Sequence, residues 1–166
     1  MTKALVTGSF DPVTRGHFEI IERASRIFDE VTVCIFINPE KSYRFSEEER
    51  LSFIRMGIDE LGLSNVKADV SSGYVADYAK EHSIGYVLRG VRNADDMAYE
   101  VAMARENNRR NPTLETLIWP SNEKSVGISS TAVRESLKKG IVLKEALLPS
   151  TAHAILTIIN KENSST

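Results

Sequence analysis

The sequence predicts an α/β fold, namely a single doubly wound, Rossmann-like domain with a five-stranded parallel sheet and C-terminal helices. Two observations lead to this prediction. Short apolar runs alternate along the chain with segments whose apolar residues recur at helical spacing. The connections between them are short, which is typical of parallel strands joined by helical crossovers. Because 166 residues suffice for one core and no linker or repeat interrupts them, we expect one domain over residues 1–166.

The first three elements follow from consecutive apolar patterns. The run KALVTG predicts a strand over 3–8, and the spacing of Phe18, Ile20 and Ile21 predicts a helix over 17–28. The run VTVCIFI predicts the second strand over 31–37.

The helix over 46–61 has the clearest start signal in the chain. Ser46 and Glu49 form a capping box, in which each side chain can bind an otherwise orphan main-chain amide of the other. The runs NVKADV, GYVLR and LETLIW predict the three remaining strands. These strands lie at 65–70, 85–89 and 114–119, with helices at 74–82 and 94–109 between them.

Two helices are expected after the last strand, over 130–138 and 150–161. Pro149 suits the start of the second of these, since proline is favoured in the first turn of a helix. The last five residues, ENSST, are expected to fray.

Composition excludes several classes of protein. The net charge of −2, from 21 basic and 23 acidic residues, indicates no nucleic-acid partner and no anionic membrane surface. The single cysteine, Cys34, lies in an apolar run and is interpreted as a buried, inert thiol. No stretch approaches the roughly 18 apolar residues that span a bilayer. The N-terminal residues lack the apolar segment of a signal peptide, so a cytoplasmic location is expected.

The segment GSFDPVTRGH, residues 8–17, follows the first predicted strand directly. In open α/β sheets this position is the carboxyl end of a strand, where ligands bind. Gly8 and Gly16 allow a sharp turn or a close approach of the backbone, and Pro12 restricts the loop. His17 falls in the first helical turn, where free amides and the helix dipole favour phosphate, although a plain surface histidine is an alternative interpretation.

Two motifs resemble the signature of the nucleotidylyltransferase superfamily. Residues 14–17, Thr-Arg-Gly-His, resemble its T/H-x-G-H motif, and residues 128–134, ISSTAVR, resemble its second motif, I-S-S-T/S-x-x-R. Each lies at the end of a predicted strand–loop–helix unit. The chain is therefore identified as a single nucleotidylyltransferase domain by resemblance.

Two further segments resemble the bacterial phosphopantetheine adenylyltransferase family. These are YVLRGVRNADDMAYE, residues 86–100, and NPEKSYRFSEEER, residues 38–50, which contains Lys41. The resemblance implies reversible transfer of AMP from ATP to 4′-phosphopantetheine in coenzyme A biosynthesis, with dephospho-coenzyme A and pyrophosphate as products. It also implies Mg²⁺ as cofactor, bound mainly through the ATP phosphates, and a homohexamer.

The resemblance also implies the site residues. The catalytic residues it implies are His17, Lys41 and Arg92. For the acceptor substrate it implies Ser9, Lys41, Val75 and Arg89. For ATP it implies Ser9, Phe10, His17, Gly90, Val91, Arg92, Glu100, Ser125, Val126, Gly127, Ile128, Ser129, Ser130 and Thr131.

The chemistry of that reaction fits these residue types. A phosphate monoester is already ionised at neutral pH, so the nucleophile needs no general base. The difficulty is to hold it in line with the α-phosphate of a polyanion, which is a problem of positioning and charge stabilisation. Lys41, Arg89, Arg92 and His17 supply the cations and donors that this requires.

Plainer interpretations remain open for several of these residues. Lys41 fits a solvated loop charge, and Arg92 can simply pair with Asp95 or Asp96. Glu100 fits a charge on a helix surface, near Arg105. The residues SST at 129–131 fit an ordinary helix N-cap, which is compatible with phosphate binding.

One departure from the family and two rival functions also remain. Family members carry aromatic residues on both sides of a serine just before I-S-S, whereas this chain has Ser125-Val126-Gly127, which leaves the adenine contact open. The rival functions are a related nucleotidylyltransferase with another phosphorylated acceptor and a nucleotide-binding protein that catalyses no reaction.

Overall fold

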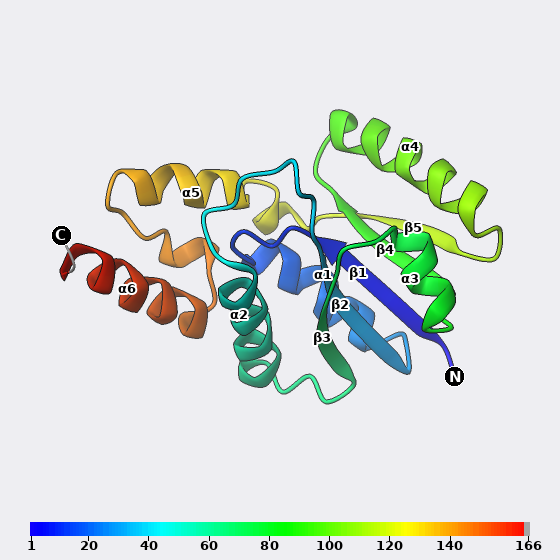
Figure 1. Cartoon of the computed structure of the whole chain (residues 1–166), viewed down its shortest axis with the longest axis horizontal. Helices are drawn as coiled ribbons and strands as arrows, with labels where there is room; N and C mark the ends of the chain where they lie inside the picture. The colour runs from blue at the N-terminus through cyan, green and yellow to red at the C-terminus, as the bar shows by residue number, and fades with distance from the viewer. Residues whose placement is uncertain (165–166) are drawn as a thin grey trace.

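A parallel sheet forms the centre of the molecule in the computed structural model, which describes residues 1–164 (Figure 1). Its strands lie in the order β3-β2-β1-β4-β5, and every neighbouring pair is parallel. The strands are β1 (Lys3–Gly8), β2 (Glu30–Phe36), β3 (Val66–Ser71), β4 (Tyr86–Val91) and β5 (Glu115–Pro120). The predicted α/β fold with a five-stranded parallel sheet is therefore confirmed.

All six predicted helices are present, together with two short 3₁₀ turns that the sequence did not predict. The helices are α1 (Arg15–Ser25), α2 (Glu47–Glu60), α3 (Val75–Glu81), α4 (Ala94–Arg110), α5 (Ser130–Lys138) and α6 (Pro149–Ser164). The 3₁₀ turns are η1 (Glu123–Ser125) and η2 (Lys144–Ala146). No helix among residues 1–164 is both long and apolar enough to cross a membrane.

The strand order places a switch in chain direction between β1 and β4. After β1 the chain adds β2 and then β3 outward on one side, and it returns to place β4 on the other side. The connections that leave the carboxyl ends of β1 and β4 therefore diverge, which opens a crevice between them. The loop after Gly8 and the end of β4 at 89–91 face this crevice.

Successive residues of each strand pack on opposite faces of the sheet. In β1, Ala4 and Val6 belong to one core and Leu5 belongs to the other. The first core includes Phe18 of α1 and Ile155 of α6, and the second is built with α3. The sheet is thus covered on both faces, which explains why its strands are almost continuously apolar.

Cys34 lies in the second core with no exposed surface, as predicted. Its burial raises the pKa of the thiol to about 12, so it stays protonated at neutral pH. Tyr78 of the same core donates a hydrogen bond to Asp69 of β3 at 2.6 Å, which fastens α3 to the sheet.

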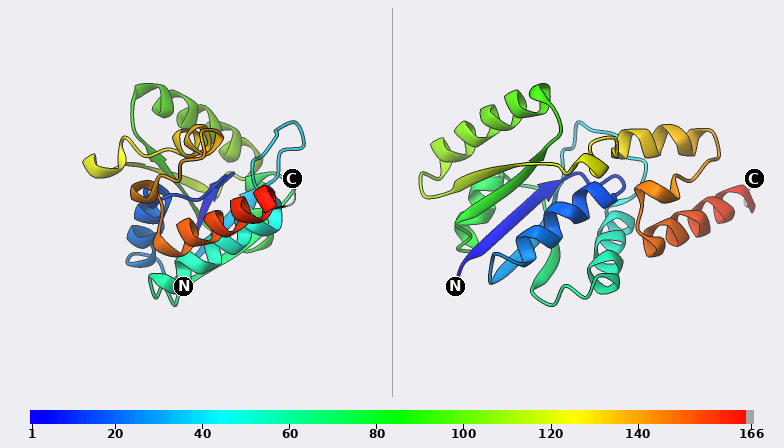
Figure 2. Two further views of the ribbon diagram at one scale, coloured as in Figure 1. Left: turned by 90° about the vertical axis from the view of Figure 1, so that its left-hand side faces the viewer. Right: turned by 180° about the vertical axis from the view of Figure 1, so that it is seen from behind.

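Helices α5 and α6 lie beyond the carboxyl ends of the strands, on the side of the crevice (Figures 1 and 2). Helix α6 packs against α2. The helix expected over 150–161 extends from Pro149 to Ser164, so residues 162–164 do not fray as expected. Glu162 in this last turn forms an ion pair with Arg44 at 2.7 Å. The last two residues of the segment expected to fray, 165–166, lie outside the described residues.

Two other boundaries differ from the sequence prediction for local reasons. Helix α1 begins at Arg15 rather than at residue 17, because Thr14 is its N-cap, and it ends at Ser25 rather than at residue 28. Strand β4 continues past Arg89 to Val91, since Gly90 and Val91 still pair with β5. The capping box of Ser46 and Glu49 is present as predicted.

Helix α2 packs closely against the ring of Phe18 of α1 at Gly57, and this contact can be tested by a substitution. A Cβ at Gly57 would lie 2.0 Å from Cζ of Phe18, whose ring is only 2% exposed. Helix propensity alone favours alanine by about 1 kcal/mol, but overpacking a core costs about 1–3 kcal/mol. Because the added Cβ would lie so close to the ring, we expect a cost of about 2–3 kcal/mol and therefore a net loss of about 1–2 kcal/mol in the free energy of unfolding of Gly57→Ala, measured by urea denaturation.

The matched control is Gly85→Ala, because no atom lies within 4 Å of the Cβ it would add. We expect that change to stay within about 0.5 kcal/mol. Equal unfolding midpoints for Gly57→Ala and the wild type would contradict the tight contact with Phe18.

Candidate active site

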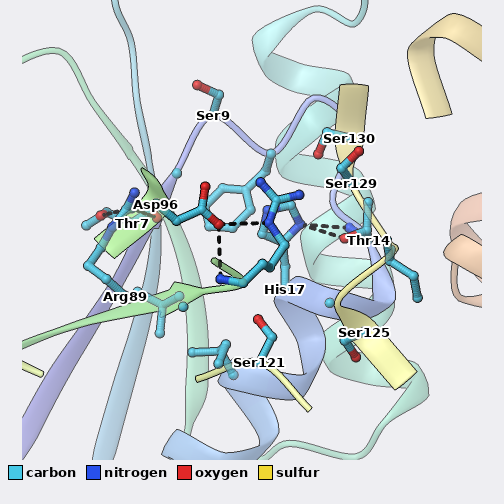
Figure 3. Close-up of a pocket in the computed structure, with 18 of the residues that line it drawn as sticks. Thr7, Ser9, Thr14, His17, Arg89, Asp96, Ser121, Ser125, Ser129 and Ser130 are labelled. Atoms are coloured by element: carbon cyan, nitrogen blue, oxygen red, sulfur yellow. Dashed lines mark hydrogen bonds and ion pairs between the residues drawn. The ribbon is translucent and has the colours of Figure 1, made fainter. Parts of the chain in front are cut away.

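A cavity of about 320 Å³ fills the crevice at the carboxyl ends of β1 and β4 (Figure 3). His17 lies near its centre, with Thr14 and Ser129 to one side and Arg89 to the other. A second cavity of about 770 Å³ adjoins it. The two cavities share lining residues from β1, its loop, β4 and α4, which are Thr7, Gly8, Ser9, Arg89 and Glu100.

The loop between β1 and α1 is held through its main-chain carbonyls. Arginines from three different elements each donate to one main-chain carbonyl at residues 7, 9 and 11, of which residue 7 lies near the end of β1 and the other two lie in the loop. The pairs are Arg89 Nη1 with Thr7 O, Arg50 Nη1 with Ser9 O at 2.7 Å, and Arg134 Nη1 with Asp11 O at 2.8 Å. The loop therefore takes its shape only when β4, α2 and α5 are in place around it.

The Asp11 side chain connects this loop to the segment that carries Lys41. The carboxylate is 3% exposed and accepts hydrogen bonds from the main-chain amides of Arg44 at 2.8 Å and Phe45 at 3.0 Å. Sequence reasoning did not single out Asp11, because Asp-Pro indicates only a turn.

Phe10 contributes to the cavity in a way that its residue type did not predict. Its φ of 48° places it in the left-handed region, where glycine was the expected residue type. The ring is 2% exposed and packs edge-on against His17, with 5.0 Å between ring centroids. The Phe10 ring thus packs against one side of the His17 imidazole. Gly8 and Gly16, the two glycines of this segment, do not have a positive φ.

The tautomer of His17 follows from its hydrogen bonds. Nδ1 lies 3.0 Å from the main-chain amide of Thr14, and because an amide N–H can only donate, Nδ1 must accept. The proton of the neutral ring is therefore on Nε2, where it can be donated to a ligand. Burial lowers the pKa of His17 to about 4, with further lowering by the positive charges of Arg89 and Arg92. His17 is neutral at pH 7, and its place in the first helical turn is confirmed.

Arg89 and Glu100 form an ion pair in the wall between the cavities, in which the carboxylate is buried and the guanidinium is half-buried. The guanidinium donates to the carboxylate through Nε at 2.7 Å and Nη2 at 2.8 Å, and Nη1 donates to the Thr7 hydroxyl at 2.8 Å. Glu100 is 5% exposed, so its interpretation as a surface charge near Arg105 is wrong. The pair fixes the direction of Arg89 before any ligand arrives.

Arg92 lies at the rim of the first cavity and pairs with Asp96 of the same segment. Oδ2 of Asp96 accepts from both the main-chain N and the side-chain Nε of Arg92, each at 3.0 Å. The sequence left open whether Arg92 pairs with Asp95 or Asp96, and in the structure its partner is Asp96, four residues later. This contact holds the Arg92 side chain in place and lowers the pKa of Asp96.

The segment before and at the start of α5 forms the opposite wall. Ser129 caps α5 by accepting from the amide of Ala132 at 3.0 Å, and the Ser130 hydroxyl donates to Pro12 O at 2.8 Å. The N-cap interpretation of Ser129 is therefore correct. Five of the seven predicted ATP residues of this segment line the first cavity, namely Ser125, Ile128, Ser129, Ser130 and Thr131.

Three predicted ATP residues do not line either of the cavities in the described part of the chain. Val126 is 45% exposed, Gly127 has open space around it, and Val91 is buried in the sheet. Gly90 does line the first cavity, where its backbone passes close to Ile20.

Lys41 and Val75 line the second cavity, not the first. Lys41 is exposed on the loop after β2, and Val75 begins α3. Of the predicted residues that line a cavity, Lys41 and Val75 line only the second, Ser9, Arg89 and Glu100 line both, and the others line only the first.

Sequence reasoning missed several residues that shape the site. Arg134 stood in the quoted ISSTAVR motif, and its exact spacing from Ser129 was a usable signal. Arg50 carried no such signal: it is 2% exposed, donates to the carbonyl of Ser9, and lies over the ring of Tyr43 at 4.0 Å.

Comparison with known proteins agrees with the geometry. Residues 5–136 match the model of the cytidylyltransferase-like family. The phosphopantetheine adenylyltransferase of Clostridium novyi (strain NT) is 38% identical over 161 residues, which cover 97% of each chain. That of Actinobacillus pleuropneumoniae serotype 5b (strain L20) is 41% identical over 131 residues, covering 79% of this chain and 82% of the relative.

A solved structure shares the fold at low sequence identity. The nicotinic acid mononucleotide adenylyltransferase of Plasmodium falciparum, complexed with NaAD, superposes with a TM-score of 0.70 at 16% identity over 95% of each chain. Together with the match over residues 5–136, the level of identity to the curated relatives decides the family. The chain belongs to the phosphopantetheine adenylyltransferase family of cytidylyltransferase-like proteins.

Proposed function

We propose that this chain catalyses the reversible transfer of AMP from ATP to 4′-phosphopantetheine, giving dephospho-coenzyme A and pyrophosphate. The observation that carries the proposal is the pair of cavities with a shared wall of Thr7, Ser9 and Arg89. His17 lines the first cavity and Lys41 the second. A nucleotide and a phosphorylated acceptor bound on either side of this wall would bring their phosphates together there.

The proposed reaction is an in-line displacement at the α-phosphorus. An oxygen of the acceptor's phosphate forms the new bond, and the bond from the α-phosphorus to the oxygen bridging to the β-phosphate breaks, so that pyrophosphate leaves with the electron pair. The acceptor phosphate has a second pKa of about 6, so no residue has to remove a proton from it. The protein's contribution is positioning and charge stabilisation.

His17 is proposed to stabilise the charge that develops on the α-phosphate. Its Nδ1 is occupied by the Thr14 amide, which leaves Nε2–H as the donor. The low pKa keeps the ring neutral, so the interaction is a directed hydrogen bond. The edge-on Phe10 ring and the helix turn restrict the imidazole to one orientation.

Arg92 and the start of α5 are proposed to hold the triphosphate. The first turn of α5 offers free main-chain amides and the positive end of a helix dipole, which favour phosphate. The Ser129 cap and the contact from Ser130 to Pro12 keep that turn against the β1–α1 loop. Arg92 would exchange part of its contact with Asp96 for a phosphate oxygen.

Lys41, Arg89 and Val75 are proposed to bind the acceptor. Arg89 uses most of its N–H groups on Glu100 and Thr7, so it would present a fixed positive charge and a remaining Nη2 proton to the acceptor's phosphate. Lys41 would bind the same phosphate from the second cavity, and Val75 would meet the arm of the acceptor.

Mg²⁺ is proposed to enter with ATP, bound by phosphate oxygens and water. Among residues 1–164, no group of three or more His, Cys, Asp or Glu side chains is arranged to hold a metal. Mg²⁺ commonly keeps several waters and relies on substrate phosphates, so the site fits a metal bound in this way. When bound, it would neutralise part of the triphosphate charge.

A homohexamer and a cytoplasmic location complete the proposal. The exposed apolar side chains on α4, Met97 at 41%, Tyr99 at 59% and Met103 at 37%, would suit burial between subunits.

The reaction is tested by pyrophosphate release from ATP and Mg²⁺ with three acceptors. We expect turnover with 4′-phosphopantetheine and almost none with pantetheine. A hydroxyl nucleophile would need a general base worth about 10²–10⁴ in rate, and it would leave the cations Lys41 and Arg89 without a phosphate. Nicotinate mononucleotide is the third acceptor, and turnover with it alone would favour the rival of a related enzyme. No release with any acceptor would favour a protein that only binds nucleotides.

His17→Ala is expected to lower turnover by about a hundredfold or more, because it removes one donor to charge that develops in the transition state. ATP affinity, measured by titration calorimetry with Mg²⁺ present, should stay close to that of the wild type. His153→Ala is the matched control, because His153 is exposed on α6. Near-normal turnover of His17→Ala would remove this residue from the catalytic group.

The lowered pKa of His17 predicts a dependence of stability on pH. Between its folded pKa of about 4 and its ordinary value of 6.5, the unfolded chain binds more protons at this residue than the folded chain does. The free energy of unfolding must therefore fall as the pH falls through this range. From about pH 7 to about pH 5 the contribution is about 2 kcal/mol.

Urea denaturation of the wild type and His17→Gln at both pH values isolates this contribution. The variant should lose about 2 kcal/mol less than the wild type on acidification, whereas His153→Gln should behave as the wild type does. An equal loss in His17→Gln and the wild type would show that His17 titrates normally.

A further inference from the structure

Lys41 lies on a loop that the sheet does not position directly. Residues 37–46 connect β2 to α2, and Lys41 is exposed near the middle of this segment. The direction of its ammonium group therefore depends on what holds the loop.

The middle of the loop is bonded to itself through Asn38. The Asn38 carbonyl accepts from the amide of Lys41 at 3.1 Å, and its side-chain oxygen accepts from the amide of Glu40 at 2.9 Å. The amide of Asn38 donates to the Tyr43 hydroxyl at 3.1 Å. Residues 38–43 thus form one unit, which carries Lys41 with it.

This unit is attached to the rest of the molecule at its far end. The Tyr43 ring lies against the buried guanidinium of Arg50, and Asp11 accepts from the amides of Arg44 and Phe45. The Phe45 ring is 1% exposed in the core. These contacts hold the backbone at 44–45, and at the start of the loop the amide of Ile37 donates to the carbonyl of Ser71 at 2.9 Å.

The Arg44 side chain adds a second attachment, to the last part of α6. Its Nη1 and Nη2 donate to the two carboxylate oxygens of Glu162 at 3.1 and 2.7 Å, across 118 residues of sequence. The two side chains are 34% and 50% exposed, so the pair adds little to global stability. Its two parallel bonds do, however, define the direction of the Arg44 side chain relative to α6.

We propose that Arg44 and Glu162 are positioning residues for Lys41: through their ion pair, α6 sets the tilt of the loop and thereby the affinity for the acceptor's phosphate. The proposal rests on the proposed function only in that Lys41 meets this phosphate. It assigns a role in acceptor binding to a helix that lines neither cavity within the described residues.

The steady-state test uses Glu162→Gln and Arg44→Met. We expect the KM for 4′-phosphopantetheine to rise about two- to fivefold in each, the range typical of a partly exposed ion pair. The KM for ATP and kcat at saturation should stay unchanged. Glu30→Gln is the matched control, because Glu30 pairs with Lys67 at 2.8 Å at the other end of the sheet. A KM change equal to that of the control would overturn the proposal.

A double-mutant cycle with Lys41→Ala separates positioning from a general structural effect. If the ion pair acts through Lys41, Glu162→Gln should have no further effect on the acceptor KM once Lys41 is alanine. The same two- to fivefold rise in both backgrounds would overturn the proposal, since it would show an effect that bypasses Lys41. Arg44→Lys should restore part of the wild-type KM.

Hydrogen–deuterium exchange tests the attachment without any substrate. The amides of residues 38–43 should exchange faster in Glu162→Gln than in the wild type, while those of α2 exchange equally. Unchanged exchange would overturn the proposal whatever the assay shows. Absence of turnover by the wild type would instead overturn the proposed function, and faster exchange would still support the attachment of the loop by α6.

Discussion

Guanidinium groups bind the end of β1 and the loop that follows it at the carbonyls of residues 7, 9 and 11, and the candidate site depends on these contacts. A buried carbonyl that loses its hydrogen-bond partner lowers the stability of the fold by about 1–3 kcal/mol. Each of the three arginines therefore stabilises this part of the backbone. The donors come from β4, α2 and α5, which are far apart in the sequence. The shape of the loop therefore depends on contacts with three elements that are distant in sequence.

These contacts also set the electrostatics of the site. Arg50 is 2% exposed, and no carboxylate among residues 1–164 lies within 4.0 Å of its guanidinium. Arg89 and Arg92, although paired, still act on His17 strongly enough to help lower its pKa to about 4. Burial is the main cause of this low pKa, and the positive potential that would attract a triphosphate adds to it, so the histidine stays neutral. A neutral imidazole with Nδ1 occupied is a donor of one fixed direction, which suits stabilisation of charge at a single position.

The pairs in the site differ in how firmly they hold their cations. Arg89 is fixed by Glu100 and Thr7 in the half-buried wall between the cavities, and the more exposed Arg92 is fixed by Asp96. Such prior pairing removes part of the entropy that would otherwise be lost when a ligand orders the side chains. Among residues 1–164, no carboxylate forms an ion pair with Lys41, so the direction of this side chain depends on the loop that carries it. The second cavity is therefore the more adjustable half of the candidate site.

The sequence by itself determined the features that act over a few residues. Apolar periodicity determined the strands and helices, and the Ser46–Glu49 capping box, the Ser129 cap and the first-turn position of His17 could all be predicted from spacing. Only the tertiary structure decided which charges meet: Glu100 faces Arg89, and Glu162 faces Arg44 across 118 residues. The left-handed backbone of Phe10 could not be predicted either, because the residue type disfavours it and the ring's contact with His17 exists only in the folded structure. The physical reason is that these contacts form only when β4 lies beside β1 and α6 packs against α2. Both pairings join segments far apart in the sequence, and no local sequence pattern specifies them.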